Sequence, residues 1–392
     1  MSPQLLYSCC YFVLCMSNGV TLAFFPLYAS YLGFSALQIA AVSAVSNIAV
    51  LVGAPGFTTL SYHLVSPRRI LFCSSLLACF FYLPLLFVTK FSTLLALWLP
   101  CLIFNSGASV MIDTRAIRES ANQQIRFELA RTWGSIGFVC SLALIGLLID
   151  QFGLQVIVKV GFLFTCATHA LAYLVMPRLP ESPGSTFDPN PEPLPVMKYA
   201  RPLFWVLVAV AFSWASHAAY YVYFSIYLRA LGWSGFGISL AWNTGVVAEI
   251  VLFWYFRGFS EKFSLTHILR MSAVLSVCRW IILALTANTA VLVAAQILHA
   301  FSFGALYLSS IKLVQLVSPP EFRDRGQGLL SGFGGGGGSL MGRGIFGLLA
   351  SNILQAENYY LLFWPAALLA GLGAYASFRF AEPEADRKLK LR

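Results

Sequence analysis

The sequence predicts an all-α membrane protein with twelve transmembrane helices in two six-helix bundles. Three observations predict this fold class. First, 59% of the 392 residues are hydrophobic and only 10% are charged, whereas about a quarter of the residues of a soluble domain are charged. Second, the apolar residues form runs of about 20, the length at which a helix crosses a bilayer. Third, one polar, proline-rich stretch separates these runs into two sets of six.

The apolar runs are read as helices because a helix satisfies its own backbone hydrogen bonds in lipid. The twelve predicted spans lie near residues 5–32, 36–62, 70–89, 92–114, 128–149, 154–177, 202–229, 236–256, 268–287, 289–316, 327–352 and 358–379. The dividing stretch, PRLPESPGSTFDPNPEPLPVMKYAR, follows the sixth span. We therefore predict an N-terminal bundle over 1–180, a cytoplasmic linker over 181–200, a C-terminal bundle over 201–380 and a cytoplasmic tail over 381–392.

Basic residues in the connections predict the orientation of the chain. The even-numbered connections carry Arg68, Arg69, Arg115, Arg118, Arg126, Arg178, Lys198, Arg201, Arg257, Lys262, Arg270, Arg323 and Arg325. The odd-numbered connections hold little beyond Lys90, Lys159 and Arg229. Because positive residues remain on the cytoplasmic side, both termini are expected in the cytoplasm.

The composition also excludes several classes of function. The net charge of +10 is dispersed over short connections as a topology signal, so nucleic acid is not an expected partner. The nine cysteines lie in apolar runs without metal-ligand spacing, so we expect them to be packing residues and expect no metal. No catalytic spacing of serine, cysteine or metal ligands is visible in the sequence, and we expect neither enzymatic activity nor a cofactor.

Polar groups at the junction of the fourth and fifth predicted spans mark a first candidate site. Asn105, Ser109 and Asp113 follow one another at intervals of four, on one helix face. Arg131 lies about a turn inside the fifth span. Since a charge at the bilayer centre costs roughly 2.5 to 3.5 kcal/mol, we expect Asp113 and Arg131 to form a functional pair. The alternative is that both side chains snorkel to the interface.

The second half has a larger set of polar residues in its spans. They are Trp214, His217 and Tyr221 on one face of the seventh span, Trp242 and Glu249 on one face of the eighth, Arg279 in the ninth, and Gln296, His299 and Ser302 in the tenth. The carboxylate, the arginine and the two histidines would each be a costly burial alone, which indicates that they meet. Burial favours a neutral carboxyl and a nearby arginine favours the charged form, so Glu249, Arg279 and His299 could act as a proton switch.

A run of glycines interrupts the eleventh predicted span. Gly332, Gly334 and Gly337 match the dinucleotide pattern GxGxxG, but no strand precedes them and no βαβ unit contains them, so the match is accidental. Two readings remain open: a helix face on which a neighbour packs closely, and a helix that bends. Arg343, about two-thirds along the span, is expected either to point inward or to snorkel outward.

Several short motifs resemble the branch of the major facilitator superfamily that includes lactose permease and the phenylpropionate permease. They are FFPLY from Phe24, Asp113 with Arg131 in RTWGS, GVVAE ending at Glu249, Arg279 in SVCRW and His299 in QILHAF. The resemblance implies two pseudo-symmetric bundles and secondary transport. Ser302 stands where lactose permease has its proton-carrying glutamate, which leaves Glu249 or Asp113 as the proton carrier. Phe138 replaces the tryptophan on which that permease stacks its sugar.

Together these observations predict a monomeric, multi-pass importer in the inner membrane of a bacterial cell, coupled to the proton gradient. The expected substrate is a small organic solute, most simply an aromatic carboxylic acid of phenylpropionate type. The residues expected to bind it are Asp113, Arg131, Trp133, Trp214, His217, Tyr221 and Trp242. A sugar or nucleoside symporter and an exporter of hydrophobic compounds remain as alternatives.

Overall fold

The computed structural model describes residues 2–63, 67–121, 123–175, 196–353, 355–384 and 386. Within these ranges the chain is helical and contains no strand. It divides into two compact units, one formed by Met1–Pro191 with Ser234–Ser239 and the other by Glu192–Trp233 with Leu240–Arg392. The domain boundaries given above stay predictions, and most of the expected linker at 181–200 lies outside the described residues.

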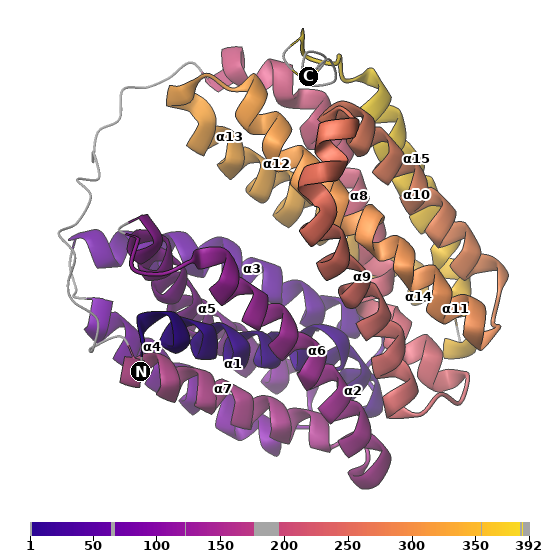
Figure 1. Ribbon diagram of the computed structural model, residues 1–392. Coiled ribbons are helices and arrows are strands. Elements are labelled where there is room, and N and C mark those ends of the chain that lie inside the picture. Colours follow the sequence, from indigo (N-terminus) through magenta and orange to yellow (C-terminus); the bar gives the residue numbers. More distant parts are fainter. Residues whose placement is uncertain are drawn as a thin grey trace. The chain divides into compact units, whose positions relative to one another are not determined.

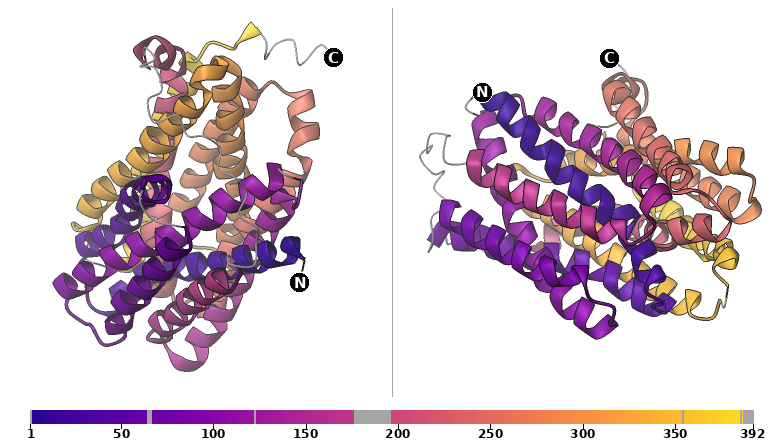
Figure 2. Two further views of the ribbon diagram at one scale, coloured as in Figure 1. Left: turned by 90° about the vertical axis from the view of Figure 1, so that its left-hand side faces the viewer. Right: turned by 90° about the horizontal axis from the view of Figure 1, so that it is seen from below.

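Seven α-helices and one short 3-10 helix build the first unit in the described residues. They are α1 (Pro3–Ala23), α2 (Phe25–Tyr31), α3 (Ala36–His63), α4 (Pro67–Tyr82), η1 (Leu83–Leu86), α5 (Phe91–Ala121), α6 (Phe127–Phe152) and α7 (Val156–Val175). The helix α1 lies alongside α6 and α7, while α5 packs against α3 and α4 (Figures 1 and 2). This arrangement places the end of α5 and the start of α6 next to α1.

The first predicted span, 5–32, comprises two helices. The helix α1 ends at Ala23, and α2 begins at Phe25 with Pro26 in its first turn. Proline has no backbone N–H and its ring clashes with the preceding turn, so it is placed at the start of a helix rather than inside one. The sequence signal for this break was therefore Pro26 itself.

The helices of the second unit are less regular, because 3-10 and π-helical turns interrupt several of them. They are α8 (Val196–Ala230), α9 (Gly235–Lys262), α10 (Leu265–Leu285), α11 (Thr289–Ala295), η3 (Gln296–Leu298), η4 (Ala300–Ala305), α12 (Leu306–Val317), η5 (Pro320–Phe322), α13 (Arg323–Leu329), η6 (Leu330–Gly337), α14 (Gly338–Ala350), η7 (Ala356–Leu362) and α15 (Phe363–Arg379). The helix α8 packs against α14 and α15, and α10 packs against α15 and α12 (Figure 1).

Eleven helical segments in the described residues are long and apolar enough to cross a membrane. The predicted span at 327–352 is not among them, so the expected number of twelve stays a prediction. This segment is helical, but it consists of α13, a π-helical stretch, η6, and α14. Its glycines contribute no apolar side chains and Arg343 carries a charge, which lowers its hydrophobicity below that of the other spans.

The glycines of α14 make a close contact with α8. A Cβ atom on Gly338 would overlap the backbone of Ala211, and one on Gly342 would overlap the backbone of Ala215. Small residues four apart on both helices let the two backbones approach, as in other membrane helix pairs. Close packing is therefore the role of these two glycines.

Candidate functional site

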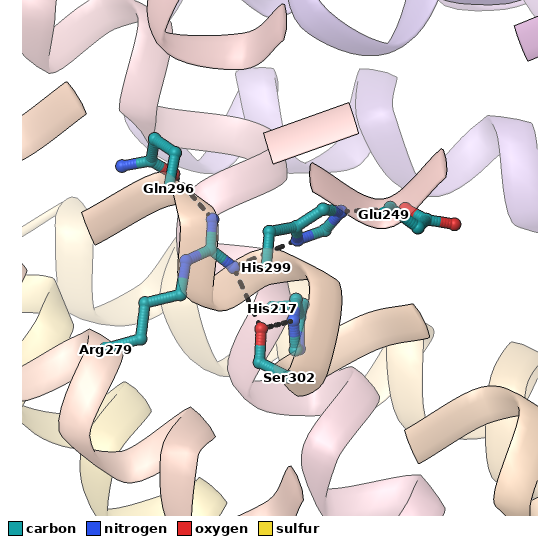
Figure 3. A network of polar contacts seen from close by, with 6 residues as sticks. All are labelled: His217, Glu249, Arg279, Gln296, His299 and Ser302. Atoms are coloured by element: carbon teal, nitrogen blue, oxygen red, sulfur yellow. Dashed lines mark hydrogen bonds and ion pairs between the residues drawn. The ribbon is translucent and has the colours of Figure 1, made fainter. Parts of the chain in front are cut away.

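A buried arginine organises the polar interior of the second unit. Arg279 on α10 has no exposed surface. One of its nitrogens, Nη1, donates to Nδ1 of His299 at 3.1 Å and to Oγ of Ser302 at 3.3 Å, while Nη2 donates to Oε1 of Gln296 at 2.7 Å. Figure 3 shows the guanidinium pointing toward these three side chains. All three partners are formally neutral, so none of them cancels the charge of Arg279.

The contact with Arg279 determines the tautomer of His299. A guanidinium only donates hydrogen bonds, so Nδ1 of His299 must accept and the ring proton must reside on Nε2. The Nε2 atom lies 3.4 Å from Oε2 of Glu249 on α9 (Figure 3). His299 therefore connects a permanently charged group to a carboxyl that can take up a proton.

A second histidine extends this network toward α8. His217 places its Nδ1 atom 2.8 Å from the carbonyl oxygen of Ser213, which can only accept, so Nδ1 carries the proton. Its Nε2 atom is then an acceptor and lies 3.5 Å from the hydroxyl of Ser302. Arg279, Ser302 and His217 thus form a continuous polar chain through the interior of the unit.

The helical segment that carries Gln296, His299 and Ser302 is irregular. Gln296 opens a 3-10 turn, and Ser302 lies in the π-helical stretch η4. Such departures from the α-helix re-aim side chains and are frequent at functional sites. The glycine in η4 lets α9 come close, because a Cβ on Gly304 would lie 3.0 Å from Cγ of Glu249. This local geometry brings Glu249 within reach of His299.

Aromatic side chains surround the network. Trp242 is buried, donates from Nε1 to Oγ of Ser225 at 2.9 Å and stacks on Tyr221 with ring centroids 6.0 Å apart. Trp214 packs against Phe303, with centroids 5.0 Å apart. The indole N–H of Trp242 is already satisfied and its ring is buried against Tyr221, so Trp242 forms an apolar wall behind the ring of Tyr221.

The first unit has a separate and more open charged group. Nη1 of Arg131 on α6 lies 3.9 Å from Oδ1 of Asp113 on α5, and the two side chains are 57% and 42% exposed. The hydroxyl of Tyr11 donates to the same oxygen of Asp113 at 2.5 Å, and the ring of Tyr11 faces the Arg131 guanidinium at 5.5 Å. Asp113 and Arg131 lie together, and both side chains keep exposed surface.

The role of Tyr11 was not predicted from the sequence. Tyr11 is fully buried on α1, and only the packing of α1 against α5 and α6 brings its hydroxyl to Asp113. Trp133, which was expected to contact substrate, is 43% exposed and meets Phe12 edge to face at 6.5 Å between centroids. No sequence signal distinguished Tyr11 from the other tyrosines of the chain.

The predicted site residues therefore occupy two groups, one in each unit. Glu249, Arg279, His299 and His217 form one connected network. Asp113 and Arg131 form the other with Tyr11. Arg343, for which two orientations were open, is only 5% exposed and so does not snorkel outward.

A known protein family matches nearly the whole chain. The sequence model of the MFS_1 like family matches residues 4–362. A "Probable 3-phenylpropionic acid transporter" of Escherichia coli (strain K12) is 26% identical over 310 residues, which cover 78% of this chain and 80% of the relative. A "Maltose permease" of Geobacillus stearothermophilus is 22% identical over 334 residues, covering 84% of this chain and 83% of the permease.

Solved structures share the fold. A crystal structure of the nucleoside transporter NupG superimposes with a TM-score of 0.85 at 16% sequence identity, covering 97% of this chain and 100% of that one. At this identity the likeness concerns the arrangement of helices alone.

Proposed function

Because this chain belongs to the MFS_1 like family, a group of major facilitator superfamily transporters, we propose that it is a proton-coupled symporter of a small aromatic carboxylic acid. It imports an acid of phenylpropionate type by alternating access. It works as a monomer in the inner membrane of a bacterial cell, with the proton gradient as its driving force and without a cofactor.

The observation that supports this proposal is the series of polar contacts from Glu249 through His299 to Arg279. Arginine does not lose its proton in proteins, and Nδ1 of His299 is occupied by the Arg279 donor. Among these three contacting residues, Glu249 is therefore the one that exchanges a proton. A carboxyl in a span is neutral when it is shut off from water and charged when water or a cation reaches it. Alternating exposure of Glu249 would load the proton on one side and release it on the other.

The first unit supplies a polar contact for the solute. Asp113 and Arg131 form a pair of opposite charges, and both side chains retain exposed surface. Such a pair can donate hydrogen bonds from the guanidinium and accept them on the carboxylate. Tyr11 holds the carboxylate in place by its hydroxyl. We assign this pair to contact with the solute and Glu249 to coupling.

An aromatic acid suits the side chains of the second unit. Tyr221 and Trp242 stack with an interplanar angle of 25°, and Trp214, also on α8, is half-buried and packs against Phe303. Flat apolar rings accept a phenyl group by offset stacking or edge contact. The name of the E. coli relative agrees with this substrate class, whereas the maltose permease relative supports a sugar.

Uptake by reconstituted protein tests the proposal. Proteoliposomes containing the purified chain receive radiolabelled 3-phenylpropionate, with the outside more acidic than the inside. Protein-free liposomes and a protonophore control correct for passive entry of the neutral acid. We expect uptake above both controls that is competed by other aromatic acids and not by galactosides or nucleosides. Uptake of a galactoside or nucleoside instead would show that the substrate is a sugar or nucleoside rather than an aromatic acid. Proton-driven efflux would show that the protein is an exporter.

A further inference from the structure

A second buried arginine lies in the interior of the second unit without an acidic partner. Arg343 on α14 is 5% exposed. Its Nη1 atom donates to the carbonyl oxygen of Ser339 at 3.3 Å, and its Nε atom has no hydrogen-bond partner in the part of the chain that the structure describes. No aspartate or glutamate among the described residues forms an ion pair with it. The Nε donor of this buried guanidinium is thus left without an acceptor in the described residues.

The helix that carries Arg343 is held firmly in register. Gly338 and Gly342 are in backbone contact with Ala211 and Ala215 of α8, so α14 cannot slide or rotate without losing this contact. Arg343 is seven residues before the end of α14 at Ala350, a rise of roughly 10 Å at 1.5 Å per residue. The arginine is therefore fixed in the interior of the helix rather than at its end.

The surroundings of Arg343 contain more positive than negative charge. Tyr221 is close enough to Glu249, Arg279 and Arg343 to interact electrostatically with all three. Arg279 and Arg343 are both positively charged, and neither forms an ion pair with a carboxylate in the described residues, so no acidic side chain there compensates their charge. An unpaired buried charge is costly, and a bound anion would remove this cost.

The other two arginines in the candidate sites are less suited to binding an anion. Arg131 has a carboxylate at 3.9 Å, so that pair is formally neutral. Arg279 has its guanidinium engaged by three side chains and lies 4.5 Å from the ring centroid of Tyr220. Arg343 has neither a carboxylate nor a set of side-chain acceptors in the described residues.

We infer that Arg343 binds the carboxylate of the transported acid, whose aromatic ring then lies beside Tyr221. This inference rests on the proposed function and names the residue that selects acids over neutral analogues. A guanidinium and a carboxylate form charge-assisted hydrogen bonds, often two in parallel, which a neutral amide cannot match. Arg343 would therefore supply the main charge that recognises the carboxylate, in addition to the contact that Asp113 and Arg131 make with the solute.

Binding and uptake of an acid and its uncharged analogue test this assignment. The probes are 3-phenylpropionate and 3-phenylpropionamide, measured by titration calorimetry of the full-length protein in detergent and by uptake into proteoliposomes. We expect Arg343→Gln to weaken binding of the acid at least tenfold and to leave binding of the amide within about twofold, so that the preference for the acid is lost. Arg257→Gln is the matched control, because Arg257 is 92% exposed.

A charge-conserving variant keeps the test decisive if Arg343→Gln does not fold. Arg343→Lys retains the charge but not the planar fork, so we expect weaker binding of the acid, unchanged binding of the amide and a smaller preference between them. Acid affinity equal to wild type in either variant would overturn the role of Arg343 while leaving the proposed function intact. A wild-type protein that neither binds nor accumulates the acid would overturn both.

Discussion

The Arg279 guanidinium donates to Nδ1 of His299 at 3.1 Å, and the opposite ring nitrogen lies 3.4 Å from Glu249. These two contacts join α10 and α9 through His299, which lies between η3 and η4, so three separate helical segments share one polar network (Figure 3). Because a charged donor occupies Nδ1, a second proton on His299 would require this contact to break. This series of contacts therefore predicts that Glu249 couples transport to the proton gradient.

Removing the exchangeable proton of Glu249 should abolish the coupling of transport to the pH gradient without abolishing binding of the solute. In Glu249→Gln the amide can still accept from Nε2 of His299, but it cannot alternate between two charge states. We expect uphill accumulation in response to a pH gradient to disappear and counterflow exchange to continue at a rate within about threefold of wild type. Glu261→Gln is the control, since Glu261 is an exposed carboxyl on the same helix. Loss of binding and exchange together would instead make Glu249 a substrate contact.

Substitution of two glycines on α14 should have opposite effects on stability. A Cβ on Gly342 meets the backbone of Ala215, whereas one on Gly344 meets nothing within 4 Å. Overpacking typically costs about 1 to 3 kcal/mol, so Gly342→Ala should lower the melting temperature of the detergent-solubilised protein. Gly344→Ala should leave it unchanged or raise it, because alanine favours the helix by up to about 1 kcal/mol. Equal melting temperatures for the two variants would contradict the close contact of α14 with α8.

The hydroxyl of Tyr11 should matter for transport although its ring does not touch the proton network. In Tyr11→Phe the ring remains against Arg131, but Asp113 loses its hydrogen bond at 2.5 Å. A hydrogen bond to a charged group is worth about 1.5 to 3 kcal/mol, so a reorientation of Asp113 should reduce initial uptake about tenfold. Tyr31→Phe changes an exposed tyrosine of the same unit and serves as the control. Wild-type uptake by Tyr11→Phe would show that Asp113 is positioned without Tyr11.

A carboxylate near the end of the chain caps α10. Asp386 is buried and accepts from the backbone N–H groups of Leu265 and Thr266, both at 2.9 Å, and from the hydroxyl of Thr266 at 2.7 Å. Loss of an N-terminal cap costs about 1 to 2 kcal/mol. We expect Asp386→Ala to speed hydrogen exchange of these two amides and to lower the melting temperature. Asp386→Asn keeps one acceptor, so its exchange rates and melting temperature should lie between those of wild type and Asp386→Ala. Unchanged hydrogen exchange in Asp386→Ala would show that Asp386 does not cap α10.

The sequence by itself was enough to predict the membrane class, the positions of most spans and the residues that would be costly to bury, because hydrophobicity and charge are local properties of the chain. It also indicated that Glu249, Arg279 and His299 would meet, since none of them could remain alone in a span.

Only the tertiary structure decided what depends on contacts between distant segments. The proton position on His299 follows from Arg279, twenty residues away along the chain, and the carboxylate of Asp113 is oriented by Tyr11 from another helix. The burial of Arg343 and the backbone contact of Gly342 depend on how α14 packs against α8. The packing of two helices depends on the shapes of both surfaces. The sequence pattern of one helix contains no information about the surface of the other.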